Sequence, residues 1–324
     1  MNATSSARPR AFIQEVAPRD GFQNEPQFIP TEQKIALIDE LSKTGLAKIE
    51  VTSFTAPTVI PALADAEAVM AGIVRMPGVS YVALVPNVRG GERALRSRVD
   101  EFNLVMSVSE THNLTNLRMF REQSIAALAQ TVRLAHDAKV SANISLSCAF
   151  GCPMEGDVAS SETLGWAQRF VDLGVDGITL CDTTGMAYPT QVDALVTEFR
   201  RRWPRMTLTL HFHNTRGIGL ANVLAATQAG GDRFDAALGG IGGCPYAPGA
   251  TGNICTEDAV HMLELVGFDT AVKLPALLAC ARQLPSVVGH EVPSQLAKAG
   301  DRLTLHALPK SFSDVRARAL QRAS

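Results

Sequence analysis

Residues 177–214 of this 324-residue chain read GITLCDTTGMAYPTQVDALVTEFRRRWPRMTLTLHFHN. The apolar run Gly177–Cys181 predicts a buried strand, and Thr207–His213 predicts a second one. Between them, Pro189 stands near the start of a segment with helical periodicity. Two strands joined through a helix are typical of parallel pairing in an α/β protein. The stretch therefore predicts one strand–helix repeat, with polar residues at the ends of its strands.

The same alternation continues in both directions along the chain. The predicted strands are Phe12–Ala17, Lys48–Ser53, Tyr81–Val85, Glu101–Ser107, Val140–Ser147, Gly177–Cys181, Thr207–His213 and Arg233–Leu238. Eight strand–helix units predict a TIM (β/α)8 barrel with extra C-terminal helices. An open doubly wound sheet is the alternative, but the first strand–helix turn, Ala17–Gly21, lacks the G-x-G-x-x-G fingerprint that usually accompanies that fold.

We expect four parts along the chain. Residues 1–10 lack the apolar run of a secretory signal and predict a flexible N-terminal extension. Residues 11–270 are expected to form the barrel, and residues 271–307 a helical extension packed on it. Residues 308–324 are charged and small, which predicts a flexible tail.

Composition excludes several classes of protein. The chain is 46% apolar, which is enough for a sizeable core, and its 30 basic and 32 acidic residues give a net charge near −2. This balance gives no electrostatic reason to bind nucleic acid or an anionic membrane. No apolar run reaches the roughly 18 residues that a membrane-spanning helix needs. Six scattered cysteines predict reduced thiols and a cytoplasmic location.

The ends of the predicted strands carry a candidate metal site. His211 and His213 are two residues apart on a strand, so both imidazoles face the same side. Asp20 follows the first strand, which lies near the seventh in a closed ring. Two imidazoles and a carboxylate suit a divalent cation, to which Asn253 could add a neutral oxygen. The alternative is that the histidines are ordinary hydrogen-bonded side chains.

Charged residues beside this site suggest a catalytic role. Arg19 precedes Asp20, and a fixed guanidinium there could stabilise a developing oxyanion, although an ordinary salt bridge is the alternative. We expect Glu50 to orient Arg19 from behind and Asp182 to lie nearer the substrate.

The glycine-rich run 239–252 lacks the Gly-Lys-Ser/Thr of a phosphate-binding Walker loop, and it predicts a mobile lid. Cys244 on this run is either a thiol delivered to the site or a buried, unreactive cysteine. Cys148 and Cys152 lack partners for a metal site and are interpreted as structural.

Three motifs resemble the signatures of the 3-hydroxy-3-methylglutaryl-CoA (HMG-CoA) lyase family, over residues 11–290. They are EVAPRDGFQNE at 15–25, SCAFGCP at 147–153 and GGIGGCPYAPGATGN at 239–253. The resemblance implies a divalent cation, Mg²⁺ or Mn²⁺, an acyl-CoA substrate and a homodimer. The implied ligands of the cation are Asp20, His211, His213 and Asn253. It also implies that Arg19 stabilises an enolate and that Cys244 takes part in proton transfer, with Glu50, Asp182 and Gln23 as polar active-site residues.

The implied reaction is a retro-Claisen cleavage. A 3-hydroxyacyl thioester loses its C2–C3 bond and gives acetyl-CoA and a ketone or keto acid. We expect the acyl group to contact Gln23, Ser53, Asn143, Ser145, Thr179 and Arg216, and CoA to contact Asn24.

Two departures concern the substrate. Family members usually carry R-G-Y-V-S-C where this chain has NISLSC at 143–148, and the usual H-x-H-D-T-Y-G becomes HFHNTRG at 211–217. An arginine is thus lost at the fifth strand, and Arg216 appears after the seventh. Arg216 could hold the distal carboxylate of a different or shorter acyl group, or it could be a surface residue. Pro26 replaces a lysine expected to contact CoA.

HMG-CoA is therefore the first expected substrate, and a citramalyl-CoA or methylmalyl-CoA type of thioester is the alternative. A pyruvate aldolase or an acyl-condensing enzyme of the same group is a further possibility, against which the Cys244 loop argues. A binding barrel without activity would not need this set of charged and metal-binding residues.

Overall fold

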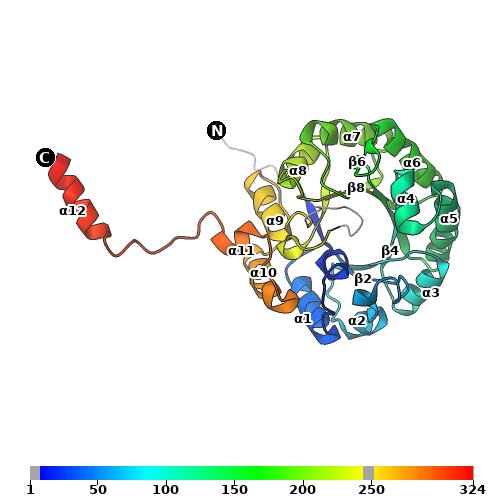
Figure 1. The fold of residues 1–324 in the computed structure, drawn as a ribbon, viewed down its shortest axis with the longest axis horizontal. Coiled ribbons are helices and arrows are strands. Elements are labelled where there is room, and N and C mark those ends of the chain that lie inside the picture. Colours follow the sequence, from blue (N-terminus) through cyan, green and yellow to red (C-terminus); the bar gives the residue numbers. More distant parts are fainter. Residues whose placement is uncertain (1–7, 244–251, 324) are drawn as a thin grey trace.

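The computed structural model describes residues 8–243 and 252–323, and its main feature is a closed barrel of parallel strands (Figure 1). The strands are β1 (Phe12–Glu15), β2 (Lys48–Ser53), β3 (Ser80–Leu84), β4 (Glu101–Ser107), β5 (Ser141–Ser147), β8 (Gly177–Asp182), β9 (Thr207–Phe212) and β10 (Arg233–Ala236). Around the ring their order is β1-β10-β9-β8-β5-β4-β3-β2. All eight predicted strands are present, with ends that differ by up to two residues, and the predicted TIM barrel is confirmed.

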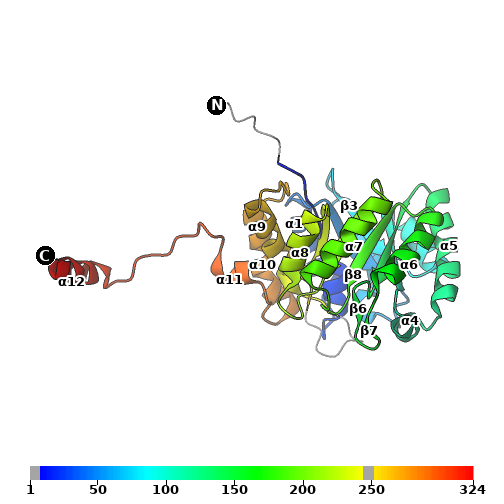
Figure 2. The same cartoon turned by 90° about the horizontal axis from the view of Figure 1, so that it is seen from above.

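Helices surround the barrel and follow its strands in turn (Figures 1 and 2). They are α1 (Thr31–Ser42), α2 (Ala66–Gly72), α3 (Val88–Arg96), α4 (Glu110–Leu117), α5 (Arg121–Asp137), α6 (Ser160–Asp172), α7 (Pro189–Arg202), α8 (Gly219–Gln228) and α9 (Thr256–Leu265). Short turns of helix, η1 (Ala17–Gly21), η2 (Pro61–Leu63) and η3 (Leu238–Gly240), follow β1, β2 and β10. A small hairpin that the sequence analysis did not anticipate, β6 (Gly151–Cys152) and β7 (Gly156–Asp157), lies between β5 and α6.

The ends of the chain differ in how they meet the barrel. The N–H of Asp269 donates to the Pro9 carbonyl at 2.9 Å, and Arg8 pairs with Glu264 at 2.9 Å, so residues 8–10 are attached to the barrel. At the other end, α10 (Leu274–Val288) packs on α9 and α1, and α11 (Gln295–Ala299) packs on α9 and α10.

The segment 308–324, expected to be a flexible tail, contains the helix α12 (Phe312–Ala323), none of whose residues is buried. Figures 1 and 2 show this helix away from the barrel. The division of the chain into four parts stays a prediction. Within the described residues, no helix is long and apolar enough to cross a membrane.

The interior of the barrel is polar. TIM barrels usually fill this space with branched apolar side chains. Here Gln14 donates to Thr209 at 3.0 Å, and Asn143 donates to Thr179 at 2.9 Å. Such side chains enclose a cavity of about 20 Å³, room for a single water molecule. Ionisable groups at the carboxyl end of the barrel therefore lie above a layer of hydrogen-bonding side chains. Burying a charge next to such a layer costs less free energy than burying it next to hydrocarbon.

Glu15 joins three segments at the carboxyl end of β1. Its side chain is completely buried and accepts hydrogen bonds from the Ala17 N–H at 2.9 Å, the Leu238 N–H at 2.8 Å and the Thr256 hydroxyl at 2.7 Å. Burial raises the pKa of Glu15 to about 8, although its three donors oppose the shift. Burial likewise raises the pKa of the neighbouring Glu257 to about 7.

These two carboxyl groups predict how stability changes with pH. Both pKa values are raised in the folded state, so the folded chain holds more protons than the unfolded chain between about pH 4.5 and 8. The free energy of unfolding should therefore fall as the pH rises through this window. The side chain in Glu15→Gln cannot ionise. We therefore expect the free energy of unfolding of this variant, measured with urea at several pH values in this window, to fall less steeply than that of the wild type. A fall as steep as that of the wild type would contradict this assignment.

Candidate active site

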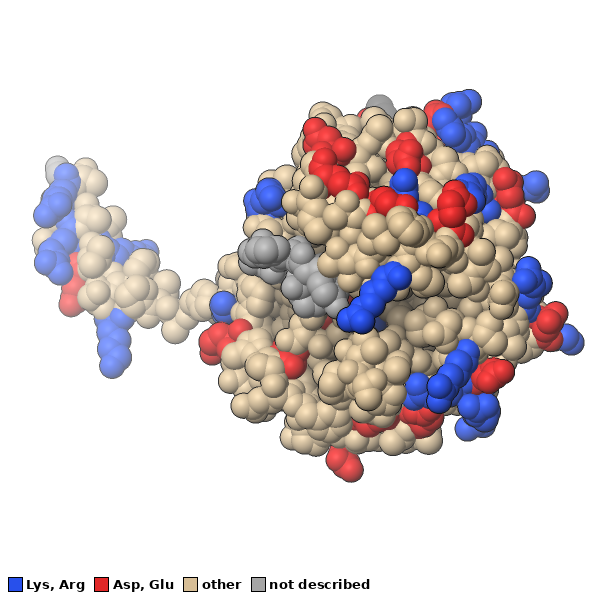
Figure 3. Space-filling model, turned by 45° about the vertical axis from the view of Figure 1, so that its right-hand side comes forward, with Lys and Arg blue, Asp and Glu red and all other residues tan. Residues whose placement is uncertain are grey.

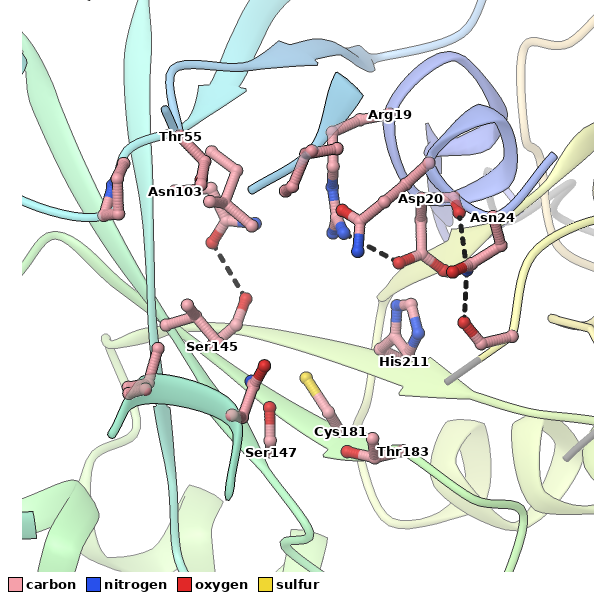
Figure 4. A pocket seen from close by; sticks show the side chains of 18 of the residues that line it. Arg19, Asp20, Asn24, Thr55, Asn103, Ser145, Ser147, Cys181, Thr183 and His211 are labelled. Carbon is pink, nitrogen blue, oxygen red and sulfur yellow. Dashed lines mark hydrogen bonds and ion pairs between the residues drawn. The ribbon is translucent and has the colours of Figure 1, made fainter. Parts of the chain in front are cut away.

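The carboxyl ends of the strands surround a cavity of about 440 Å³. Figure 4 shows side chains from opposite sides of the barrel pointing into it. Its polar lining residues are Arg19, Asp20, Gln23, Asn24, Thr55, Asn103, His112, Asn116, Ser145, Ser147, Cys181, Thr183, His211, His213 and Asp235. On the face in Figure 3, acidic and basic side chains are interspersed around the outside of the barrel, and neither sign forms a continuous patch.

Asp20, His211 and His213 lie together as predicted. One potential ligand atom from each lies within 4.8 Å of the others, and the two imidazole centroids are 5.2 Å apart. The approach is possible because β10 alone separates β1 from β9 in the closed ring, so η1 carries Asp20 up to the end of β9. A carboxylate and two imidazoles at this spacing can hold a divalent cation.

Asn253 completes the neighbourhood of this cluster. Its Nδ2 donates to Asp20 Oδ2 at 2.7 Å and to the Ile241 carbonyl at 3.1 Å, and its backbone pairs with His213. Its Oδ1 is buried and finds no hydrogen-bond partner among the described residues. A buried acceptor without a donor is uncommon and requires a reason, such as a ligand or ion absent from the structure.

The charges around Asp20 keep it ionised. Burial alone would raise the pKa of Asp20, but Arg19, His211 and His213 outweigh it and lower the pKa to about 2. Burial lowers the pKa of His211, but its hydrogen bond to Asp235 and the charges of Asp235 and Asp20 hold it above the ordinary value. The site therefore attracts positive charge.

Arg19 is held between two carboxylates. Its Nε donates to Glu50 Oε2 at 2.6 Å and its Nη1 to Asp20 Oδ1 at 2.7 Å. Glu50 lies below the main cavity, and its other oxygen accepts from Asn103 Nδ2 at 2.7 Å. The predicted orienting position of Glu50 thus matches its contacts. The fixed guanidinium lines the cavity beside Asp20, where it can stabilise negative charge on a bound molecule.

Three functional candidates were missed by the sequence analysis. Asp235 lies opposite His211 in the β10–β9 register, with its Oδ2 3.2 Å from His211 Nδ1. An aspartate within an apolar strand was the available signal. Cys181 lies opposite His211 on the other side and lines the cavity. Asn103 accepts from Ser145 at 2.8 Å and links β5 to Glu50. This contact joins residues 42 positions apart, so no local pattern indicates it.

Of the predicted substrate contacts, some reach the cavity. Gln23, Asn24 and Ser145 line it. Asn24 also donates to the carbonyl of Gly243, where the described part of the glycine-rich run stops. The prediction for Cys244 falls outside the described residues.

Other predicted contacts are not supported by this geometry. Asn143 and Thr179 lie one layer deeper and line the small inner cavity. Ser53 donates to Thr55, which itself lines the main cavity. Arg216 is not among the residues that line the cavity, and its Nη1 donates to the carbonyls of Thr184 at 3.1 Å and Gly185 at 2.7 Å.

Asp182 holds the turn after β8. Its Oδ1 accepts from the N–H groups of Met186 at 2.7 Å and Ala187 at 3.0 Å, while Oδ2 is buried with no hydrogen-bond partner in the described chain. Burial raises the pKa of Asp182 to about 6, although these N–H groups oppose the shift. Asp182 is not among the residues that line the cavity, although its neighbours Cys181 and Thr183 are.

Comparison with known proteins shows which family the chain resembles. Residues 10–284 match the model of the HMGL-like family. The hydroxymethylglutaryl-CoA lyase YngG of Bacillus subtilis is 46% identical over 286 residues, which are 88% of this chain and 96% of that protein. The (R)-citramalyl-CoA lyase of Chloroflexus aurantiacus is 38% identical over 298 residues, 89% of this chain and 94% of that protein.

A solved structure is similarly close. An HMG-CoA lyase from Acinetobacter baumannii in complex with coenzyme A and 3-methylmalate is 49% identical, with a TM-score of 0.90. The match covers 95% of this chain and all of that one. The predicted resemblance is thereby confirmed, and the chain belongs to the HMGL-like family of carbon–carbon lyases.

Proposed function

We propose that this lyase cleaves the C2–C3 bond of a 3-hydroxy-3-methylacyl-CoA, with HMG-CoA as the first substrate and acetoacetate and acetyl-CoA as the products. The observation that carries the proposal is the cluster of Asp20, His211 and His213 with Arg19 beside it, at the end of the barrel where TIM-barrel chemistry occurs. The relatives reported above support the reaction class.

The donor set fits a divalent cation, Mg²⁺ or Mn²⁺, held by Asp20, His211, His213 and Asn253. The Asn253 carboxamide contacts Asp20, and its buried Oδ1 has no partner among the described residues, so Asn253 would supply the neutral oxygen of this set. Such an ion would lower the pKa of the C3 hydroxyl and so favour transfer of its proton to a base in the cavity.

Charge balance supports the same assignment. Three carboxylates, those of Asp20, Glu50 and Asp235, have side chains at most 14% exposed and surround the single guanidinium of Arg19. Cation ligands bind in their deprotonated forms, and with all three carboxylates ionised and both imidazoles neutral the set would have a formal charge of −2, which one divalent cation would neutralise. Uncompensated charge in a buried site is costly, so the arrangement favours an ion of that charge.

The remaining steps fall to side chains. As the C2–C3 bond breaks, the C3 oxygen becomes a carbonyl and the electron pair of the bond moves toward the thioester, whose oxygen gathers enolate charge. Arg19 is placed to stabilise that oxygen, and Glu50 prevents the guanidinium from turning away. The enolate carbon then takes a proton, for which the resemblance favours Cys244 as donor.

The acyl group is the open part of the proposal. Ser145 lines the cavity at a position where family members usually carry tyrosine, and Asn143 replaces an arginine. Among the described residues, Arg19 is the only lysine or arginine that lines the cavity. This departure keeps a citramalyl-CoA or methylmalyl-CoA type of substrate as the second candidate. We also propose that CoA binds near Asn24 and that the protein forms a homodimer.

Arg19→Gln should separate binding from catalysis. Loss of one preorganised oxyanion partner typically lowers the rate about 10²- to 10³-fold, and we expect at least that loss in kcat with cation binding retained. Arg201→Gln, on the exposed side of α7 and paired only with Glu198, is the matched control and should leave kcat unchanged. Near-wild-type turnover of Arg19→Gln would remove Arg19 from the mechanism.

Removal of the cation should abolish activity and lower the melting temperature, because the buried carboxylates then lack a counter-charge. We expect EDTA to have both effects and Mn²⁺ to reverse them. Asp20→Asn should weaken Mn²⁺ binding by isothermal titration calorimetry by about tenfold or more, which corresponds to about 1.4 kcal/mol. Asp172→Asn, on the far surface in α6, should match the wild type. Full activity in EDTA-treated protein would contradict a metal-dependent reaction.

A panel of thioesters should decide the acyl group. Acetyl-CoA release is expected from HMG-CoA, whereas 3-methylglutaryl-CoA should be inert because it lacks the C3 hydroxyl that must ionise. Faster release from citramalyl-CoA than from HMG-CoA would assign the shorter substrate. Failure of every 3-hydroxyacyl-CoA to release its short acyl-CoA, which is acetyl-CoA for most of the panel and propionyl-CoA for a thioester with a methyl group on C2, would overturn the proposed reaction.

A further inference from the structure

Glu15 lies outside the cavity, yet the segments it holds all lead to the candidate active site. Its backbone belongs to β1, and its carboxylate reaches across to η3 and to the start of α9. It is the first residue of the motif that carries Arg19 and Asp20, but the mechanism above gives it no part.

The first two contacts meet at one atom. Oε1 accepts both from Ala17, the first residue of η1, and from Leu238, the first residue of η3. The turn η1 carries Asp20, and the chain leaving η3 reaches Ile241, whose carbonyl accepts from Asn253. One oxygen thus sets the separation between the turn that carries Asp20 and the strand end that leads to the glycine-rich run.

The third contact reaches the other side of that run. Oε2 accepts from Thr256, three residues after Asn253, and the backbone of Thr256 donates to Ala237 at 3.0 Å. The segment that carries Asn253 is therefore fixed to the same carboxylate as the turn that carries Asp20. The separation of these two proposed ligands, joined here by a 2.7 Å hydrogen bond, depends on the geometry around Glu15.

The surrounding residues reinforce the bridge. Glu257 is fully buried and accepts from the Gly239 N–H with both oxygens, each at 3.2 Å. Gly239 has φ of +67°, in the left-handed region, and a Cβ there would approach Leu284 to 2.8 Å, so η3 can relax little toward α10. A displacement at Glu15 would therefore be passed to η1 and to the Asn253 segment.

We propose that Glu15 is a positioning residue that sets the distance between Asp20 and Asn253 and thereby the geometry of the cation site. The inference rests on the proposed function, because it assumes that these residues hold a cation. Hydrogen bonding to Ala17, Leu238 and Thr256 is the property that matters. Glutamine offers the same acceptor at Oε1, whereas alanine offers none.

The test compares Mn²⁺ affinity, kcat, KM and melting temperature in Glu15→Ala, Glu15→Gln and a control. We expect Glu15→Ala to weaken Mn²⁺ binding at least tenfold and to lower kcat more than it raises KM. Glu15→Gln should stay within threefold of the wild type in Mn²⁺ affinity and in kcat. The control, Asp100→Ala, removes a carboxylate that accepts from the Tyr81 N–H at the amino end of the barrel. It should lower the melting temperature without changing Mn²⁺ affinity.

Thr256→Val keeps the inference testable if Glu15→Ala does not fold, because it removes a single hydroxyl contact. It should weaken Mn²⁺ binding by a smaller factor, about threefold. Wild-type Mn²⁺ affinity in folded Glu15→Ala, or in Thr256→Val, would overturn the positioning role. Loss in Glu15→Gln as large as in Glu15→Ala would also overturn it, since acceptor geometry would then not be the cause. Absence of Mn²⁺ binding in the wild type would instead overturn the proposed function.

Discussion

The approach of Asp20 to His211 and His213 is the constraint on which the rest of the site depends. It follows from closure of the barrel, which leaves only β10 between the first strand and β9. In an open sheet these strands could lie at opposite edges, and the carboxylate and imidazoles would have no reason to meet. Closure also places Arg19, the neighbour of Asp20, over the cavity with Glu50 behind it. The order of the strands in the closed ring therefore determines both the fold and which side chains meet in the site.

A second theme is the electrostatics of the barrel interior. Carboxylates at Asp20, Glu50 and Asp235 stand around one guanidinium, above a layer of amide and hydroxyl side chains. Such a layer supplies hydrogen bonds to buried charges that branched apolar residues could not. Under the proposed function, the same arrangement would raise the affinity of the site for a divalent cation and would link stability to its presence. The polar residues inside the barrel thus supply hydrogen bonds to the site, in positions where apolar side chains would otherwise pack.

Local sequence patterns account for the architecture and for the core of the site. Strand–helix alternation is visible in short windows, and spacing by two places His211 and His213 on one face.

Depth along a strand and contacts between distant strands are not visible in such windows. Asn143 and Ser145 share a face of β5, but only Ser145 reaches the main cavity, because strand stagger decides which layer is covered. For Arg216 the sequence left a substrate contact and a surface position open, and in the structure its Nη1 donates to carbonyls of the preceding strand–helix turn. Asp235 was missed because its importance comes from its partner on the neighbouring strand, His211 of β9.

Pulsed electron paramagnetic resonance of the Mn²⁺-loaded protein tests the central claim most directly, because imidazole nitrogen bound to Mn²⁺ gives a distinct ¹⁴N modulation. The account predicts coupling from two imidazoles in the wild type, reduced to one in His211→Gln and in His213→Gln. Bound Mn²⁺ without nitrogen coupling, or coupling unchanged in both variants, would place the cation elsewhere and contradict the proposed site.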